Sequence, residues 1–374
     1  MNSSPTFWRP GDDPGERRFE TLAGEDGRGF TFEGGGYLPS VTVAYETWGE
    51  LNADGSNAVL VEHALTGDSH ALGGISAGHP TPGWWNGLVG PGLAIDTEQY
   101  FVVCSNVLGG SQGTTGPSSL APDGRPYGSR FPVITVRDQV AVEAAVTDAL
   151  GIESWHAVVG GSMGGMRALE WAITYPERVA NLVVLAVGAA STADQIAHSR
   201  LQIRAIKADP NYHGGDYYDR SPPNEGLAIA RGLGQITYRT DEEFESRFAR
   251  AAHDESDVLD GGLYAVESYL GYHGEKLARR FDANSYIVLS EAMNHHDVGR
   301  GRGGVASALG SIRSRSTVLG IDSDRLYPLR LQEQLAELIP TASSLHVISS
   351  AVGHDGFLLE VDQIGKVIGE ALAS

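Results

Sequence analysis

Gly160-Gly161-Ser162-Met163-Gly164-Gly165 is the stretch of the chain that decides the fold. It contains Gly-x-Ser-x-Gly, the pattern of a tight strand-to-helix turn that presents a serine as a nucleophile. The flanks fit, because Trp155-His156-Ala157-Val158-Val159 predicts a buried strand and residues 166–173 predict a helix. The glycines remove β-carbons that would collide in such a turn. We therefore predict a nucleophilic Ser162, with the backbone N–H of Met163 facing the oxyanion that would form.

Strand-like and helical patterns alternate on both sides of this turn. Apolar runs predict strands at 41–47, 58–62, 100–105, 182–187, 317–321 and 345–348, and a helix at 136–150. Continuous apolar strands separated by helices predict a mostly parallel sheet that is covered on both faces.

The alternation breaks between residues 193 and 311. This stretch predicts helices at 195–208, 224–232, 241–251 and 262–279 and contains few strand signals. We therefore predict a helical cap domain at 193–311, inserted into a core domain formed by 1–192 and 312–374. Residues 1–35 are polar and rich in glycine, which predicts an irregular or loosely packed arm.

Composition excludes several classes of partner. The formal net charge of −20 disfavours nucleic acids and anionic membranes. No apolar run is long enough to span a bilayer, and Met1-Asn2-Ser3-Ser4-Pro5 lacks the pattern of a secretory signal. The single cysteine, Cys104, fits a reducing cytoplasm and a packed core position. We predict no metal site, because the adjacent His295 and His296 point in different directions and have no evident third ligand.

A nucleophilic serine needs a base and an acid that orients the base. In α/β-hydrolase folds these follow the serine in the order acid, then histidine. The strand at 317–321 runs into Asp322 and Asp324, and Asp324 fits an acid-x-x-x-Pro turn before Pro328. We predict Asp324 as the acid, with Asp322 as the alternative. His354, a loop residue beyond the last predicted strand, is the predicted base.

These features predict an α/β-hydrolase fold with a mostly parallel central sheet and an inserted helical cap. A second oxyanion-binding N–H should come from the turn after an earlier strand. His63-Ala64-Leu65-Thr66-Gly67 occupies that turn, and we predict Leu65 as the donor.

Nearly the whole chain resembles the homoserine O-acetyltransferases. The resemblance rests on the serine turn and on several further segments, which are 43–49, 63–70, Gly83-Trp84-Trp85, 113–117 and 296–304. It implies acetyl transfer from acetyl-CoA to L-homoserine in methionine biosynthesis, through an acetyl-Ser162 intermediate. It also implies that Arg231 holds the substrate carboxylate and Asp355 its ammonium group, and Tyr238 is a further candidate contact. A surface helix charge (Arg231) and a helix N-cap (Asp355) are the simpler alternatives.

Three expectations accompany this resemblance. The protein should carry no permanently bound cofactor, act in the cytoplasm and form a homodimer through the cap. The phosphates of coenzyme A need cations, for which Arg300, Arg302, Arg313 and Arg315 form the nearest basic cluster in sequence. Competing hypotheses are succinyl-CoA as donor or serine as acceptor, an esterase or thioesterase, and a binding protein without activity.

Overall fold

An eight-stranded sheet forms the centre of the computed structural model, which describes residues 8, 9, 11–255 and 257–373. The strands lie in the order β1 (Arg18–Leu22), β4 (Val41–Trp48), β8 (Phe101–Ser105), β5 (Ala58–Glu62), β9 (Trp155–Gly161), β10 (Val179–Leu185), β11 (Arg315–Ile321) and β12 (His346–Ile348). β4 pairs antiparallel with β1 and β8, and all other neighbours are parallel. The prediction of a mostly parallel sheet is confirmed. Two small sheets pair β2 (Phe30–Thr31) with β3 (Tyr37–Leu38), and β6 (Val89–Gly90) with β7 (Ile95–Asp96).

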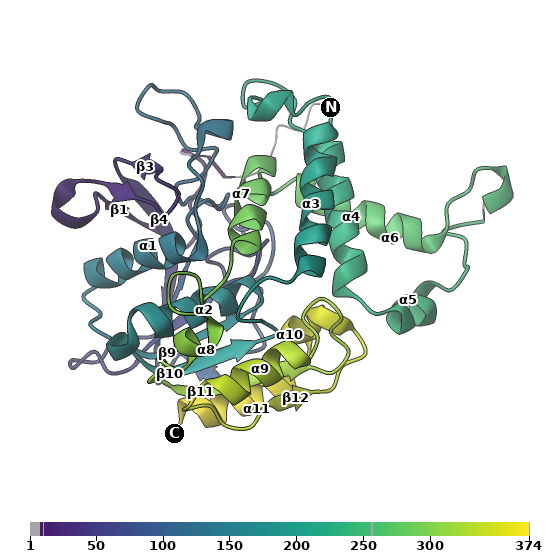
Figure 1. Ribbon diagram of the computed structural model, residues 1–374. Helices are drawn as coiled ribbons and strands as arrows, with labels where there is room; N and C mark the ends of the chain where they lie inside the picture. The colour runs from purple at the N-terminus through teal and green to yellow at the C-terminus, as the bar shows by residue number, and fades with distance from the viewer. Residues whose placement is uncertain (1–7, 10, 256, 374) are drawn as a thin grey trace.

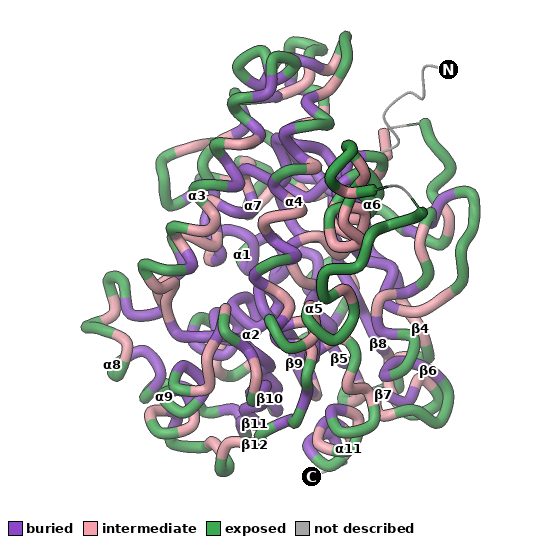
Figure 2. Tube along the Cα trace, turned by 90° about the vertical axis from the view of Figure 1, so that its right-hand side faces the viewer, coloured by how far each residue is buried: buried purple, intermediate pink, exposed green. Residues whose placement is uncertain are grey.

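Helices cover both faces of the sheet (Figure 1). On one face, α1 (Val136–Ala149), α2 (Met163–Thr174), α8 (Val305–Leu309) and α9 (Arg330–Leu338) share a buried apolar cluster with the strands. On the other face, α10 (Gly356–Leu359) and α11 (Val361–Leu372) share a second cluster with them. Val158 belongs to the first cluster and its neighbour Val159 to the second. Consecutive apolar residues are therefore needed in β9, because successive side chains point to opposite faces. Figure 2 shows this buried layer running along β5, β9 and β10.

Most of the remaining helices lie between β10 and β11 and form the cap. They are α3 (Ala193–Ala208), α4 (Asn224–Tyr238), α5 (Asp241–Phe248), α6 (Ala265–Ala278) and α7 (Ala283–Asn294). α3 packs against both α4 and α7, and α4 packs against α6 (Figure 1). Their buried cluster also contains Leu65 and Met163, so the cap packs directly over the serine turn. Val298 and Leu309 lie inside the predicted cap but pack in the first apolar cluster of the sheet. The limits 193–311 of the cap stay a prediction.

The prediction of a loosely packed arm at 1–35 is wrong for a large part of that segment. Residues 18–22 form β1, the edge strand that pairs with β4. Arg17 is buried, and its guanidinium donates to the carbonyl of Gly78 at 2.7 Å. A polar edge strand lacks the apolar run by which buried strands are recognised. Residues 1–7, where the signal pattern was sought, and residue 10 lie outside the described residues.

The cap helices differ from the prediction in several places. α4 continues to Tyr238 instead of ending at Gly232, α5 ends at Phe248 instead of residue 251, and α7 has no predicted counterpart. The extension of α4 follows from packing, since its buried face includes Gln235 and Thr237 beyond the glycine. Within the described residues, no helix has both the length and the apolar character needed to cross a membrane.

Candidate active site

Ser162 occupies a strained turn between β9 and α2. Its φ and ψ angles are 55° and −124°, a conformation that costs a non-glycine residue about 1–3 kcal/mol. The surrounding glycines are needed for close packing. A β-carbon on Gly160 would lie 2.3 Å from the Gly164 carbonyl oxygen, and one on Gly164 would lie 2.1 Å from the Glu62 carbonyl oxygen. Glycine at these two positions lets β9, α2 and β5 pack closely, and this packing holds Ser162 in its strained conformation.

The structure joins Ser162, His354 and Asp324 in one buried chain of hydrogen bonds. Oγ of Ser162 lies 2.9 Å from Nε2 of His354, and Nδ1 of His354 lies 2.6 Å from Oδ2 of Asp324. All three residues are buried. This geometry allows His354 to take a proton from the serine while Asp324 holds the imidazole.

Of the two aspartates that compete after β11, Asp324 faces the histidine. Its second oxygen accepts from the backbone N–H groups of Leu326 and Tyr327, both at 2.8 Å, which fixes the carboxylate. Asp322 is exposed and accepts instead from the N–H of Ser350 at 2.9 Å. The turn that ends at Pro328 thus orients Asp324 toward His354.

The environment of His354 favours its protonated form. Burial alone would lower the pKa of His354, but the charge and hydrogen bond of Asp324 outweigh it and the pKa is raised. The ring of Tyr327 stacks on the imidazole with centroids 4.9 Å apart. A base with a raised pKa binds a proton more readily once the serine gives it up.

The backbone N–H groups predicted to form the oxyanion hole, those of Leu65 and Met163, belong to residues beside Ser162. Leu65 lines the same cavity as Ser162, and Met163 is the first residue of α2. Among the described residues, neither N–H donates to a protein acceptor. Both groups are therefore available to an oxyanion.

The peptide that carries the Leu65 N–H is held from its other side. The Ala64 carbonyl accepts from the N–H of Gly67 at 2.9 Å and contacts Nδ1 of His63 at 2.8 Å. Nε2 of His63 accepts from the N–H of Val107 at 3.0 Å, so in the neutral ring Nδ1 carries the hydrogen. Burial and the charge of Arg167 lower the pKa of His63 to about 3, which keeps the ring neutral. Since N–H and C=O point in opposite directions in a trans peptide, this carbonyl contact fixes the Leu65 N–H.

The predicted substrate-binding residues line the cavity that holds Ser162. Arg231 and Tyr238 lie seven residues apart on α4, about two turns, which places them on one face of the helix. The guanidinium carbon of Arg231 is 5.4 Å from the centre of the Tyr238 ring. Asp355 also lines the cavity, and its Oδ2 pairs with Arg239 at 3.0 Å. The alternative role for Asp355 is that of a helix N-cap, but its side chain makes no N-cap hydrogen bond.

Arg239 is a residue of this site that the sequence analysis missed. It bridges Asp355 and Glu243, and its distance from each is 3.0 Å. It directly follows α4, whose predicted end lay seven residues earlier, so the pattern gave no reason to place it here.

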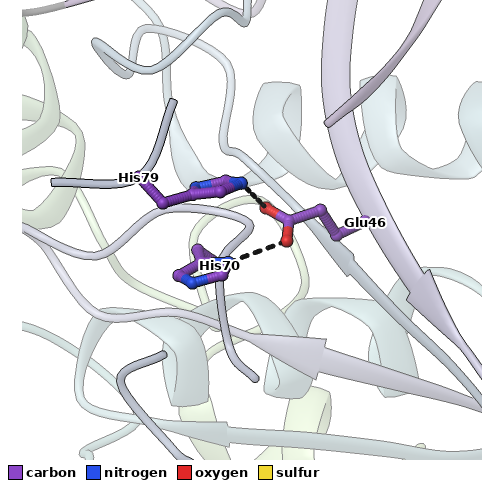
Figure 3. A group of neighbouring side chains, drawn as sticks. All are labelled: Glu46, His70 and His79. Carbon is purple, nitrogen blue, oxygen red and sulfur yellow. Dashed lines mark hydrogen bonds and ion pairs between the residues drawn. The ribbon is translucent and has the colours of Figure 1, made fainter. Parts of the chain in front are cut away.

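One cluster among the described residues has the composition of a metal site. Glu46, His70 and His79 are buried, and their ligand atoms lie within 4.8 Å of one another (Figure 3). The two imidazole rings stack with centroids 3.7 Å apart and planes 10° apart. A bound ion lies near the plane of each histidine ring, and two stacked rings do not offer that geometry.

The candidate ligand atoms of this cluster also have other partners. Nδ1 of His70 lies 2.9 Å from Glu46 and its Nε2 lies 3.1 Å from the Gly74 carbonyl, while Nε2 of His79 accepts from the N–H of Glu16. Burial would lower the pKa of His70, but the hydrogen bond and charge of Glu46 raise it. The cluster is best described as a buried, hydrogen-bonded pair of Glu46 and His70 with His79 stacked on it. Burial is the largest cause that lowers the pKa of His79, which favours its neutral form.

The arginines predicted to hold coenzyme A phosphates lie elsewhere. Arg300 pairs with Glu33, Arg302 with Glu170, and Arg313 with Glu177. None of them, nor Arg315, lines the cavity that holds Ser162. The adjacent histidines lie in different environments. His295 is exposed, whereas His296 is buried, with its Nε2 3.0 Å from the Gly188 carbonyl oxygen.

Comparison with known proteins agrees with this geometry. Residues 57–361 match the family model described as alpha/beta hydrolase fold, which places the chain in that class of enzymes. Homoserine O-acetyltransferase of Thermobifida fusca (strain YX) is 60% identical over 368 residues, which cover 98% of this chain and 96% of that protein. The chain belongs to the homoserine O-acetyltransferase family.

Solved structures include both transferases and hydrolases. Homoserine O-acetyltransferase from Bacillus anthracis is 29% identical, with a TM-score of 0.87 over 96% of this chain and 97% of that one. An acetylester hydrolase from Corynebacterium glutamicum is 27% identical, with a TM-score of 0.81 over 96% of each chain. The same fold thus serves proteins named for different acyl acceptors.

Proposed function

We propose that this protein transfers the acetyl group of acetyl-CoA to the hydroxyl of L-homoserine, giving O-acetyl-L-homoserine, a step of methionine biosynthesis. The observation that carries the proposal is the hydrogen-bonded chain Ser162–His354–Asp324 in a cavity that also presents Arg231 and Asp355. The relatives' names support the choice of substrates. A cytoplasmic location and a homodimer formed through the cap stay predictions.

In the first half-reaction, Ser162 becomes acetylated. Its Oγ attacks the thioester carbonyl carbon while His354 Nε2 takes the hydroxyl proton. The N–H groups of Leu65 and Met163 donate to the oxyanion. The intermediate collapses, the bond to sulfur breaks, and His354 returns the proton so that coenzyme A leaves as the thiol.

In the second half-reaction, homoserine takes the acetyl group. Arg231 binds its carboxylate and the free oxygen of Asp355 its ammonium group, which holds the side-chain hydroxyl near the acetyl carbon. His354 takes the hydroxyl proton as the new ester bond forms. The bond to Ser162 Oγ then breaks, and His354 returns the proton to the serine.

A hydrolase is the second candidate, because the acetylester hydrolase of known structure shares this fold over nearly the whole chain. In that case water would accept the acetyl group from Ser162. Succinyl-CoA as donor and serine as acceptor remain narrower alternatives, since they would use the same hydrogen-bonded chain.

The deciding experiment measures thiol release from acetyl-CoA with homoserine, with serine and with no acceptor, and repeats it with succinyl-CoA. Rapid release that requires homoserine and acetyl-CoA supports the proposal. Equal release without an acceptor identifies a hydrolase, and preference for succinyl-CoA or serine changes the substrates.

Ser162→Ala is the matched variant for the covalent step. It should lose about 10⁴-fold or more of the rate, because the nucleophile and its base act as one unit. Mass spectrometry of the native protein with acetyl-CoA alone should show one added acetyl group, which the variant should lack. A variant that retains turnover would contradict the covalent mechanism.

A further inference from the structure

A second cavity lies beside the active-site cavity and is lined by basic side chains. It encloses about 340 Å³, against about 110 Å³ for the cavity that holds Ser162. The two share Arg231, Asp355 and Leu358, so they adjoin. The basic cavity is lined by Arg231, Arg239, His273, Lys276 and Arg280, with Asp355 as the acid.

Among the described residues, two of these cations, Arg231 and Lys276, have no acidic partner, whereas the charge of Arg280 interacts with that of Asp68. Arg231 lies over the Tyr238 ring and Lys276 lies 5.9 Å from the centre of the Tyr272 ring, while Arg280 donates to the Thr66 carbonyl at 2.9 Å. Arg239 pairs with Glu243 and Asp355. The contrast with Arg300, Arg302 and Arg313, which all pair with glutamates, is clear.

The charges of these cations affect the pKa values of Arg280 and His273. Burial, together with the charges of Arg231 and Lys276, lowers the pKa of His273 to about 4. Burial is also the largest cause that lowers the pKa of Arg280; the charge of Asp68 opposes this shift and the charge of Arg231 adds to it. Although the chain has a net charge of −20, four cationic side chains line this one cavity, and two of them, Arg231 and Lys276, have no acidic partner among the described residues. Like charges at this spacing repel one another, and a bound anion would relieve the repulsion.

We propose that this basic cavity binds the phosphate groups of the acyl-CoA donor, while the thioester end reaches Ser162 past Arg231, Asp355 and Leu358, which line both cavities. The inference rests on the proposed function and specifies where its larger substrate lies. Guanidinium groups grip phosphate oxygens in pairs and an ammonium group adds a point charge, so Arg280 and Lys276 suit a polyanion. The narrow inner cavity then has to hold only the acetyl group and the small acceptor.

Lys276→Gln is the sharpest test, because Lys276 is exposed and its removal breaks no internal hydrogen bond of the described structure. The KM for acetyl-CoA should rise about 3- to 10-fold, and more in combination with Arg280→Gln. With S-acetylpantetheine, a donor without phosphates, the variant and the parent should have equal KM values. Arg279→Gln is the control, since Arg279 is a neighbouring exposed cation that pairs with Glu275 and lines neither cavity.

Calorimetric titration with coenzyme A gives a readout that is independent of turnover. Weaker binding to Lys276→Gln but not to Arg279→Gln supports the inference, even if homoserine proves to be the wrong acceptor. An unchanged KM and unchanged binding in Lys276→Gln would overturn it, as would an equal loss with S-acetylpantetheine. If the parent protein binds no coenzyme A, the inference and the choice of donor both fail.

Discussion

At the scale of single residues, the orientation of the peptide between Ala64 and Leu65 depends on His63. Its Nδ1 holds the Ala64 carbonyl and its Nε2 accepts from Val107, so each ring nitrogen has a separate task. The substitutions Asn and Gln separate these tasks. An Asn amide reaches the position of Nδ1 and keeps a donor for Ala64, whereas a Gln amide reaches the position of Nε2 and keeps an acceptor for Val107.

We expect His63→Asn to acylate Ser162 much faster than His63→Gln. Loss of a complete oxyanion donor costs about 10²–10³-fold in rate, and Gly67 still holds the carbonyl, so a difference of about 10-fold is expected. The measurement is the burst phase with p-nitrophenyl acetate, which needs neither coenzyme A nor homoserine. Equal melting temperatures would exclude a difference in folding, and equal burst rates would refute this role of His63.

Sequence signals at this scale differ among the site residues. Ser162 stands in a recognisable motif, and His354 and Asp324 follow it in a known order, so their positions could be predicted. Arg239 and His63 could not be assigned a task from pattern alone, because their partners, Asp355 and Val107, come from distant parts of the chain.

At the scale of elements, the close contact between β5 and α2 requires glycine at position 164. Gly164→Ala should destabilise the protein by about 1–3 kcal/mol, since the new methyl group would meet the backbone of Glu62. Gly369→Ala in α11 is the matched control, because nothing lies within 4 Å of that position. It should stabilise the protein by about 0.5–1 kcal/mol through helix propensity. Thermal unfolding measures both changes, and a neutral Gly164→Ala would contradict the tight packing.

The central strands could be predicted because both of their faces are buried, which demands continuous apolar runs. β1 could not, because it lies at the edge of the sheet and three of its five residues are exposed. The length of α4 also escaped prediction, since the glycines in its sequence, 226, 232 and 234, are ordinary signals of a helix end. Tertiary packing overrode that local signal and brought Tyr238 onto the same face as Arg231.

At the scale of the whole molecule, the cluster of Glu46, His70 and His79 ties together distant parts of the chain. Glu46 belongs to β4, the histidines to the loop after β5, and Glu16 to the segment before β1. The charged groups around His70 are Glu46, Asp68 and, through His79, Arg17. The cluster therefore links protonation to the attachment of the N-terminal segment.

We expect His70→Gln to lower the free energy of unfolding by about 1.5–3 kcal/mol at pH 6 and by less at pH 9. The folded state raises the pKa of His70, so its contribution is complete below about pH 6.5 and is lost as pH rises through the raised value. Urea unfolding at the two pH values measures this difference. Glu46→Gln should remove the same pH-dependent part, and a loss that grows with pH would contradict the ion pair.

The order in which the chain supplies the active site has a consequence for synthesis. Ser162 follows β9, but Asp324 follows β11 and His354 follows β12, the last strand of the sheet in chain order. A growing chain on the ribosome thus carries its serine for nearly two hundred residues without a base to activate it. The hydrogen-bonded chain of Ser162, His354 and Asp324 can therefore form only after β12 and the loop that follows it have been synthesised.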